Sequence, residues 1–307
     1  MDEVAPVSRL EDVSTPSLLG TGAHFIHAFR ARLRPSMEPR SGADHYTVPE
    51  LGARVLAALA AAGHDPEALS VEDLAPFDAF HTRGRAATEE LAAEVALDAG
   101  ARVLDVGCGI GGTSRFLAAR AGCHVTGIDL TPEYVRVAEL LSARSGLAER
   151  TTFRHASALE LPFEARSFDL VWTEHVQMNV ADKARFYGEI ARVLRPGGRL
   201  AFHDLFAGPA TTPLAFPVPW ASHAWLSHLV APESVRALLA ALGFEALHWL
   251  DVTAPARDFF ARAAGAPPRP LGLQLLMGDS TREKLGNVLA NLEADRLRVV
   301  RAVLARP

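Results

Sequence analysis

An aspartate followed by closely spaced glycines is the part of the sequence best suited to binding a ligand. In Ala101–Gly112 (A-R-V-L-D-V-G-C-G-I-G-G), an apolar run around Val103 leads through Asp105 into a glycine-rich turn. Glycines leave no Cβ between backbone and ligand, and the free N–H groups of a helix that follows would point back at the turn. The segment therefore predicts a buried strand, a ligand-binding loop and a helix.

The glycine spacing distinguishes two kinds of ligand. Loops that bind dinucleotides read G-x-G-x-x-G, whereas this loop reads G-x-G-x-G-G, and Asp105 precedes Gly107 by two residues. A carboxylate at this place repels a pyrophosphate, but it can accept hydrogen bonds from an ammonium group or orient the loop amides. The pattern favours a ligand with a cationic end. In the alternative interpretation, Asp105 only stabilises the turn.

A second acidic residue, Asp129, ends the next apolar run, H-V-T-G-I-D-L. It follows the glycines by about 20 residues, the separation expected of an acid that accepts hydrogen bonds from both hydroxyls of a ribose. The alternative is a helix cap, because Thr131 or Pro132 opens the next predicted helix.

Polar residues cluster after the fourth predicted strand, in Glu174–Val180 (E-H-V-Q-M-N-V). In open α/β sheets, ligands bind beyond the carboxyl ends of the strands, so Glu174, His175, Gln177 and Asn179 are expected to face the reaction. His175 is the first candidate for a general base, with Glu174 as an alternative base or as its orienting partner. A structural, hydrogen-bonded histidine is an equal alternative for His175, because a sequence does not report its pKa.

Together these motifs resemble the class I S-adenosylmethionine-dependent methyltransferases. The resemblance rests on D-V-G-C-G-I-G-G, on Asp129 and on the turn L-R-P-G-G-R-L, which occur in the expected order, and it extends from about Asp44 to the C-terminus. The runs S-V-E-D-L-A-P-F-D-A-F-H-T-R-G-R-A-A-T and E-H-V-Q-M-N-V-A-D-K are similar to a bacterial small-molecule branch that includes sarcosine/dimethylglycine N-methyltransferase-like proteins. The resemblance implies an enzyme with S-adenosylmethionine as cofactor and S-adenosylhomocysteine as product.

The resemblance also implies which residues bind the cofactor. The methionine end falls to Asp105 and Gly107, the ribose to Asp129, and the adenine to the segment A-S-A-L-E-L-P, in which Ser157 replaces the aspartate of many members. The full predicted cofactor set is Asp105, Gly107, Gly109, Asp129, Leu130, Ser157, Ala158 and Glu174.

The remaining site predictions concern the acceptor of the methyl group. The predicted catalytic residues are His175, Glu174 and Tyr46, and the predicted substrate contacts are His81, Gln177, Asn179, His203 and Trp220. No metal site is predicted, because the spacing of His203, His223 and His228 matches no helix-based pair of ligands that also includes an acid.

The predicted reaction is an in-line displacement at the sulfonium methyl group, onto an amine or another metabolite nucleophile. The enzyme would mainly align donor and acceptor and exclude water. A neutral amine needs little help from a base, whereas a phenol or a carbon acid needs one, so N-, C- and O-methylation all stay open. Two further alternatives are a nicotinamide-dependent oxidoreductase and a cofactor-binding protein without turnover.

Strands and helices alternate along the chain, which predicts a doubly wound α/β fold. We expect a seven-stranded Rossmann-like sheet whose last strand, Leu297–Leu304, is antiparallel. Residues 1–40 form an extension without assigned chemistry, residues 41–97 a helical lid with a polar hinge at Phe77–Arg85, and residues 98–307 the methyltransferase domain. Insertions at about 207–232 and 255–294, the second with two helices, are expected to cover the substrate.

Composition limits the classes of partner. The chain has 307 residues, 49% of them hydrophobic, and a formal charge of -5, which does not suit a nucleic-acid-binding surface. Two cysteines support neither a disulfide framework nor a cysteine-ligated zinc site. No apolar run approaches the ~20 residues of a membrane helix. We expect a cytoplasmic protein that acts on a small molecule, and homo-oligomerisation stays open.

Overall fold

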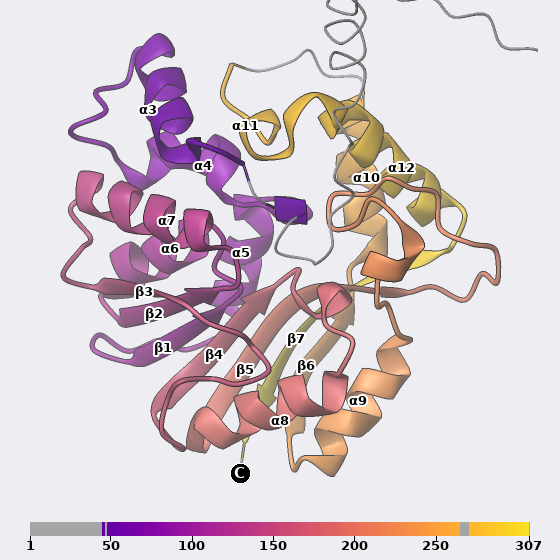
Figure 1. Ribbon diagram of the computed structural model, residues 1–307. Helices are drawn as coiled ribbons and strands as arrows, with labels where there is room; N and C mark the ends of the chain where they lie inside the picture. The colour runs from indigo at the N-terminus through magenta and orange to yellow at the C-terminus, as the bar shows by residue number, and fades with distance from the viewer. Residues whose placement is uncertain (1–44, 47, 265–269, 307) are drawn as a thin grey trace, which may run out of the picture. The chain divides into compact units, whose positions relative to one another are not determined.

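The computed structural model describes residues 45–46, 48–264 and 270–306 (Figure 1). The predicted extension at residues 1–40 lies outside the described residues. Within the described part of the chain, no helix is both long enough and apolar enough to cross a membrane.

Seven strands form one sheet in the order β3-β2-β1-β4-β5-β7-β6. Neighbours among β1 to β5 are parallel, and β7 is antiparallel to both β5 and β6. This arrangement confirms the predicted doubly wound sheet with an antiparallel last strand. The strands are β1 (Arg102–Val106), β2 (His124–Asp129), β3 (Thr151–His155), β4 (Phe168–Glu174), β5 (Leu194–Ala207), β6 (Glu245–Asp251) and β7 (Leu297–Ala305).

Successive side chains of β1 pack into different apolar clusters, because a strand alternates its faces. Leu104 and Val106 join the cluster that contains Phe186 and Leu239 of α8 (Lys183–Val193) and α9 (Pro232–Ala241). Val103 joins the cluster that contains residues of α5 (Arg85–Ala93) and α6 (Gly112–Ala121). Helices therefore cover both faces of the sheet, and Figure 1 shows α8 and α9 in front of it.

The helical lid comprises α3 (Leu51–Ala61), α4 (Val71–Asp78) and α5, with α3 packed against α7 (Pro132–Arg144). A capping box between Ser70 and Asp73 begins α4, as predicted. The polar hinge predicted from Phe77 is wrong at its start, because Phe77 is fully buried in an apolar cluster and holds the last turn of α4. The hinge is confined to residues 79–84.

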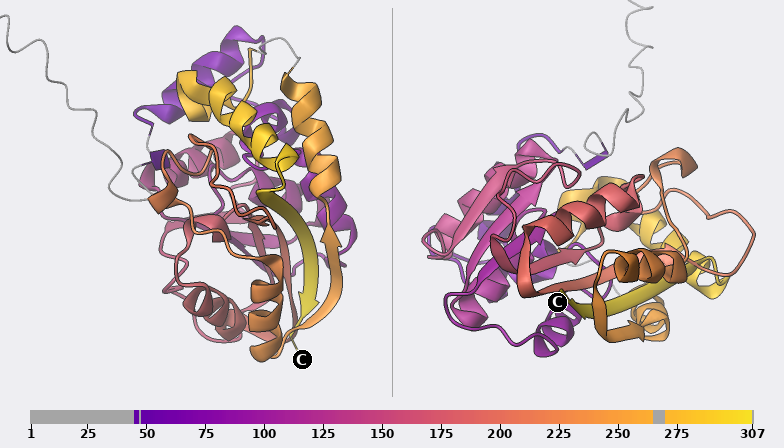
Figure 2. Two further views of the ribbon diagram at one scale, coloured as in Figure 1. Left: turned by 90° about the vertical axis from the view of Figure 1, so that its right-hand side faces the viewer. Right: turned by 90° about the horizontal axis from the view of Figure 1, so that it is seen from below.

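The C-terminal cover contains the two predicted helices and one further short helix. α10 (Thr253–Ala264) and α12 (Thr281–Glu293) lie side by side (Figure 2) and share an apolar cluster with Trp220 from the first insertion. The short helix is α11 (Gln274–Met277). α10 and α12 contact β7. At this end of the sheet β5 ends and β7 begins, with Ala207 paired to Leu297.

Candidate functional site

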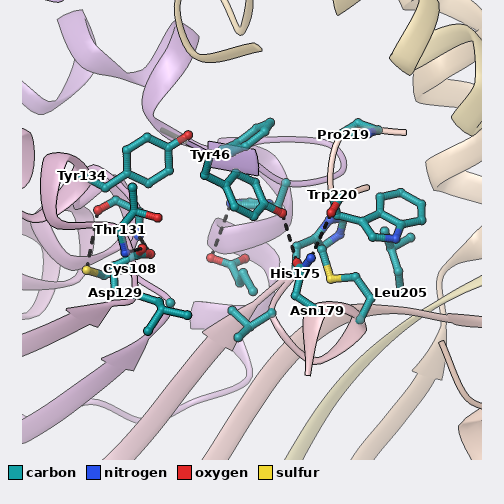
Figure 3. Close-up of a pocket in the computed structure, with 18 of the residues that line it drawn as sticks. Tyr46, Cys108, Asp129, Thr131, Tyr134, His175, Asn179, Leu205, Pro219 and Trp220 are labelled. Atoms are coloured by element: carbon teal, nitrogen blue, oxygen red, sulfur yellow. Dashed lines mark hydrogen bonds and ion pairs between the residues drawn. The ribbon is translucent and has the colours of Figure 1, made fainter. Parts of the chain in front are cut away.

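A cavity of about 500 Å³ lies at the carboxyl ends of the parallel strands. Its size falls within the ~300–1,000 Å³ of typical small-molecule sites. Its walls come from the loops after β1 to β4, from the helical lid and from the C-terminal cover. Figure 3 shows the Asp129 end and the Trp220 end on either side of Tyr46. The cavity therefore lies where an α/β sheet is expected to bind its ligand.

The glycine loop is fixed to β2 by backbone hydrogen bonds. The N–H groups of Gly107 and Cys108 donate to the carbonyl oxygen of Ile128 at 2.8 and 2.9 Å. Gly107 and Gly109 have φ angles of 75° and 54°, which glycine adopts without strain. A Cβ on Gly109 would meet no atom within 4 Å, so the backbone there faces open space. A ligand can approach the loop closely at this position.

The Asp129 carboxylate is in contact with the loop. Its Oδ2 accepts a hydrogen bond from the Gly109 N–H at 3.0 Å, and its Oδ1 accepts one from the Thr131 N–H at 2.8 Å. A carboxylate oxygen accepts two hydrogen bonds, so each oxygen can still bind a hydroxyl. The N-cap residue of α7 is Thr131 rather than Asp129. The Asp129 carboxylate thus contacts both the glycine loop and the start of α7, with acceptor sites left for a ligand.

Asp105 is a buried carboxyl group at the cavity wall, with 2% of its surface exposed. Its Oδ2 accepts a hydrogen bond from the Ser114 hydroxyl at 2.6 Å. Burial, with a smaller contribution from the charge of Glu174, raises the pKa of Asp105 to about 7 against the opposing effect of the Ser114 hydrogen bond. A cation bound in the cavity would stabilise the ionised form of this carboxyl group.

The predicted adenine residues also lie at the cavity. Leu130, Ser157 and Ala158 line it, and the Ser157 hydroxyl accepts a hydrogen bond from the Leu159 N–H at 3.2 Å. Tyr134 lines the same end, and its buried hydroxyl has no hydrogen-bond partner within the described residues. Sequence analysis missed Tyr134 because its position in α7 matches an ordinary core aromatic residue.

A chain of hydrogen bonds joins the lid to the cover across the cavity. The Tyr46 hydroxyl donates to Asn179 Oδ1 at 3.0 Å, and Asn179 Nδ2 donates to the carbonyl oxygen of Trp220 at 2.9 Å (Figure 3). Burial raises the pKa of Tyr46 well above 10, so its phenol keeps its proton at neutral pH. Tyr46 therefore acts as a hydrogen-bond donor rather than as a base.

Glu174 lies in a buried polar cluster at the end of β4. Its Oε2 accepts hydrogen bonds from the Thr113 hydroxyl at 2.7 Å and the Thr88 hydroxyl at 3.1 Å. His81 Nε2 lies 3.4 Å from the same oxygen. Both Glu174 and His81 line the cavity. Side chains of the lid and of the start of α6 thus converge on one carboxylate.

His175 lines the cavity beside this cluster. Its φ angle of 55° is uncommon for a residue with a side chain and is one mark of functional sites. The ring Nε2 accepts a hydrogen bond from the Thr82 N–H at 3.4 Å, and the ring centroid lies 5.3 Å from that of His203. Burial and His81 hold the pKa of His175 well below 6.5, so the ring is neutral.

Two of the predicted substrate residues lie outside the cavity. Gln177 and His203 are fully buried and are absent from its lining. Gln177 Nε2 donates to the carbonyl oxygen of Leu205. Direct contact with a substrate is therefore not supported for either residue. The other three, His81, Asn179 and Trp220, do line the cavity.

The end of the cavity near Trp220 is apolar. The cover contributes Phe259, Phe260, Leu285 and Val288. Other apolar residues at this end are Met178 and Leu205. Sequence analysis placed the cover but not these side chains, because α10 and α12 are separated in sequence from the parallel strands. Among the described residues, no lysine or arginine lines the cavity.

Comparisons with known proteins agree with this geometry. Residues 104–202 match the family model described as a methyltransferase domain. The chloroplastic tocopherol O-methyltransferase of Arabidopsis thaliana is 46% identical over 99 residues, which are 32% of this chain and 28% of that protein. The glycine/sarcosine/dimethylglycine N-methyltransferase of Actinopolyspora halophila is 30% identical over 179 residues, 58% of this chain and 31% of that protein. The chain thus spans less than a third of the length of either relative.

A solved structure shows the same fold. The geranyl diphosphate methyltransferase in complex with SAM superposes with a TM-score of 0.60 at 20% identity, over 72% of this chain and 85% of that one. The sheet order and the antiparallel β7 match the expected Rossmann-like architecture.

Proposed function

We propose that this chain, which has the class I methyltransferase fold and a methyltransferase domain at residues 104–202, methylates an uncharged, largely apolar small molecule. The methyl donor would be S-adenosylmethionine, which supplies an activated methyl group on a sulfonium. One observation carries the proposal: Asp129 and the glycine loop are in hydrogen-bond contact at one end of a cavity whose other end is apolar.

The residues at the first end fit this cofactor. Asp129 has acceptor capacity left for the ribose hydroxyls, and the space over Gly109 is open for the nucleoside. Asp105, buried and without a cationic partner among the described residues, would bind the ammonium group of the methionine end. Leu130 and Ser157 would contact the adenine.

The acceptor class follows from the charge of the cavity. A carboxylate or a phosphate needs a cationic partner when it is buried, and no lysine or arginine of the described chain lines the cavity. This disfavours an amino-acid acceptor such as sarcosine. Aromatic and aliphatic side chains such as Phe260 and Val288 suit a hydrocarbon body instead. The tocopherol O-methyltransferase among the relatives supports an acceptor hydroxyl group.

The chain's own residues would do the remaining work. The hydrogen bonds from Tyr46 through Asn179 to Trp220 hold lid and cover together and would exclude water from the acceptor. His175 lines the cavity with a neutral ring, and it would accept the proton of an acceptor hydroxyl at Nε2 in exchange for the long hydrogen bond from the Thr82 N–H. Alignment of donor and acceptor would contribute most of the rate.

Calorimetry with S-adenosylhomocysteine tests the cofactor site. We expect micromolar binding by the wild type, loss of at least about 30-fold in affinity for Asp129→Ala, and an unchanged affinity for the exposed control Asp98→Ala. Methyl transfer is then assayed with apolar phenols and alcohols and, in parallel, with sarcosine. Absence of cofactor binding by the wild type, or binding of NADH in its place, would refute the proposal. Turnover of sarcosine alone would refute the acceptor class.

A further inference from the structure

Three potential metal ligands converge beside the cavity. His81, Glu174 and His203 each offer one ligand atom, and these atoms all lie within 4.8 Å of one another. Glu174 and His203 are register partners on the adjacent strands β4 and β5, and His81 reaches them from the connection between α4 and α5. The fold itself therefore fixes two of the three side chains next to each other.

Three of the four ring nitrogens of these histidines lack a hydrogen-bond partner among the described residues. Both ring nitrogens of His203 and the Nδ1 atom of His81 are buried without a partner in the described part of the chain. A neutral imidazole has one donor and one acceptor, and each buried polar group left unpaired costs about 1–3 kcal/mol. His203 is fully buried, so bulk water does not compensate for this cost. A bound species between the side chains would.

The donor set, and the spacing of one of its pairs, suit a metal ion as that species. His81 Nε2 and Glu174 Oε2 are 3.4 Å apart. Two ligands bound at ~2.0–2.1 Å to a tetrahedral zinc ion lie roughly 3.4 Å apart, so this pair has the required separation. Two imidazoles and one carboxylate form the donor set of many catalytic zinc sites, which keep a further position open.

We propose that His81, Glu174 and His203 bind a divalent first-row transition metal ion of the zinc type, with one coordination position open to the cavity. The side chains of His81 and Glu174 line the cavity, whereas His203 lies behind them. The open position would accordingly face the acceptor and bind its hydroxyl oxygen. This last step rests on the proposed function; the metal site itself does not.

The surroundings suit a metal site. Hydrogen bonds from Thr88 and Thr113 orient the Glu174 carboxylate, as outer partners of metal ligands do. Metal binding would displace the contact of 3.1 Å between the Thr88 hydroxyl and His81 Nε2. Thr88 would then donate to Oε1 of Glu174, which lies 3.2 Å away, so that Oε2 keeps an acceptor site for the metal. Arg301 is the register partner of His203 on β7, but its guanidinium group is paired with Glu90 and Glu94.

Cobalt titration of the full chain tests the site after dialysis against EDTA. We expect one equivalent of Co²⁺ to bind with visible absorption bands of a low-coordinate ion, and Zn²⁺ to displace it. His81→Ala and Glu174→Gln should each weaken binding at least 100-fold, whereas His248→Ala, an exposed histidine on β6, should bind as the wild type does. His203→Asn tests the buried ligand, and its melting curve monitors folding.

Two results would overturn the inference. One is wild-type Co²⁺ binding no tighter than that of His81→Ala, and the other is binding lost equally in His248→Ala. Calorimetry with S-adenosylhomocysteine on the same samples separates this inference from the proposed function. Cofactor binding without metal binding would refute only the metal site, and metal binding without cofactor binding would refute only the methyltransferase.

Discussion

Replacing Asp105 by asparagine should stabilise the free protein and weaken cofactor binding. Burial raises the pKa of this carboxyl group from 3.8 to about 7, so its ionised form is disfavoured in the folded chain. For an acid whose pKa is higher in the folded than in the unfolded chain, ionisation reduces the free energy of unfolding. This penalty begins as the pH rises above the unfolded value of 3.8 and is complete above the folded value of about 7. At ~1.36 kcal/mol per pKa unit, it amounts to about 2 kcal/mol at pH 5.5 and about 4 kcal/mol at pH 8.5.

Asparagine carries no charge and can still accept the hydrogen bond of Ser114. The free energy of unfolding of Asp105→Asn minus that of the wild type should therefore grow by about 2 kcal/mol from pH 5.5 to pH 8.5. Because the other titrating groups are common to both proteins, they largely cancel in this difference. Urea unfolding followed by tryptophan fluorescence measures it, with the exposed Asp98→Asn as the control.

Cofactor affinity should change in the opposite direction. The ammonium group of S-adenosylhomocysteine would lose a charged acceptor, which is worth about 1.5–3 kcal/mol or about 10–150-fold in Kd. A stability difference that does not vary with pH would show that burial does not raise the pKa of Asp105. Wild-type affinity in Asp105→Asn would show that Asp105 does not bind the ligand.

Three further variants test other parts of the site. His175→Ala should lower kcat on the order of 10²-fold, with the affinity for S-adenosylhomocysteine retained, in steady-state assays; an unchanged rate would exclude the base. Tyr46→Phe removes the hydrogen bond to Asn179 and should cost about 1 kcal/mol, seen in urea unfolding, and raise the acceptor KM. Arg115→Met removes the partner of buried Asp78 at 3.1 Å and leaves it only Arg85 at 3.6 Å, so the chain should be destabilised by about 3 kcal/mol, whereas Arg136→Met, at an exposed residue, should leave its stability within about 1 kcal/mol.

Local pattern was sufficient to predict the sheet and the proximity of Asp129 to the glycine loop. The central strands β1 and β4 appear as short apolar runs that end in glycine or a polar residue, since both faces of each strand are covered. The contact between Asp129 and Gly109 joins adjacent strands that are 20 residues apart, so spacing along the chain already reports it. The prediction of these residues needed no knowledge of the rest of the fold.

The acceptor end could not be predicted to the same depth, because its walls depend on packing between distant segments. Phe260 and Val288 read as helix-core residues in the sequence, and only the position of α10 and α12 at the strand ends turns them toward the cavity. For His203, the sequence predicted a contact with the substrate that the structure does not support. It ends an apolar run at the edge where ligands bind, yet it lies behind the cavity wall.

Strand pairing explains both why His203 is buried and why it lies beside Glu174. Register places the two residues side by side on β4 and β5, and the hinge at residues 79–84 brings His81 against them. A core that only needed packing would fill this place with apolar side chains, because unpaired imidazole nitrogens cost free energy. The chain instead keeps three polar side chains there, next to His175, whose backbone has a positive φ angle. Unpaired buried polar groups that lower the stability of the free chain are expected at a site that a bound ligand stabilises.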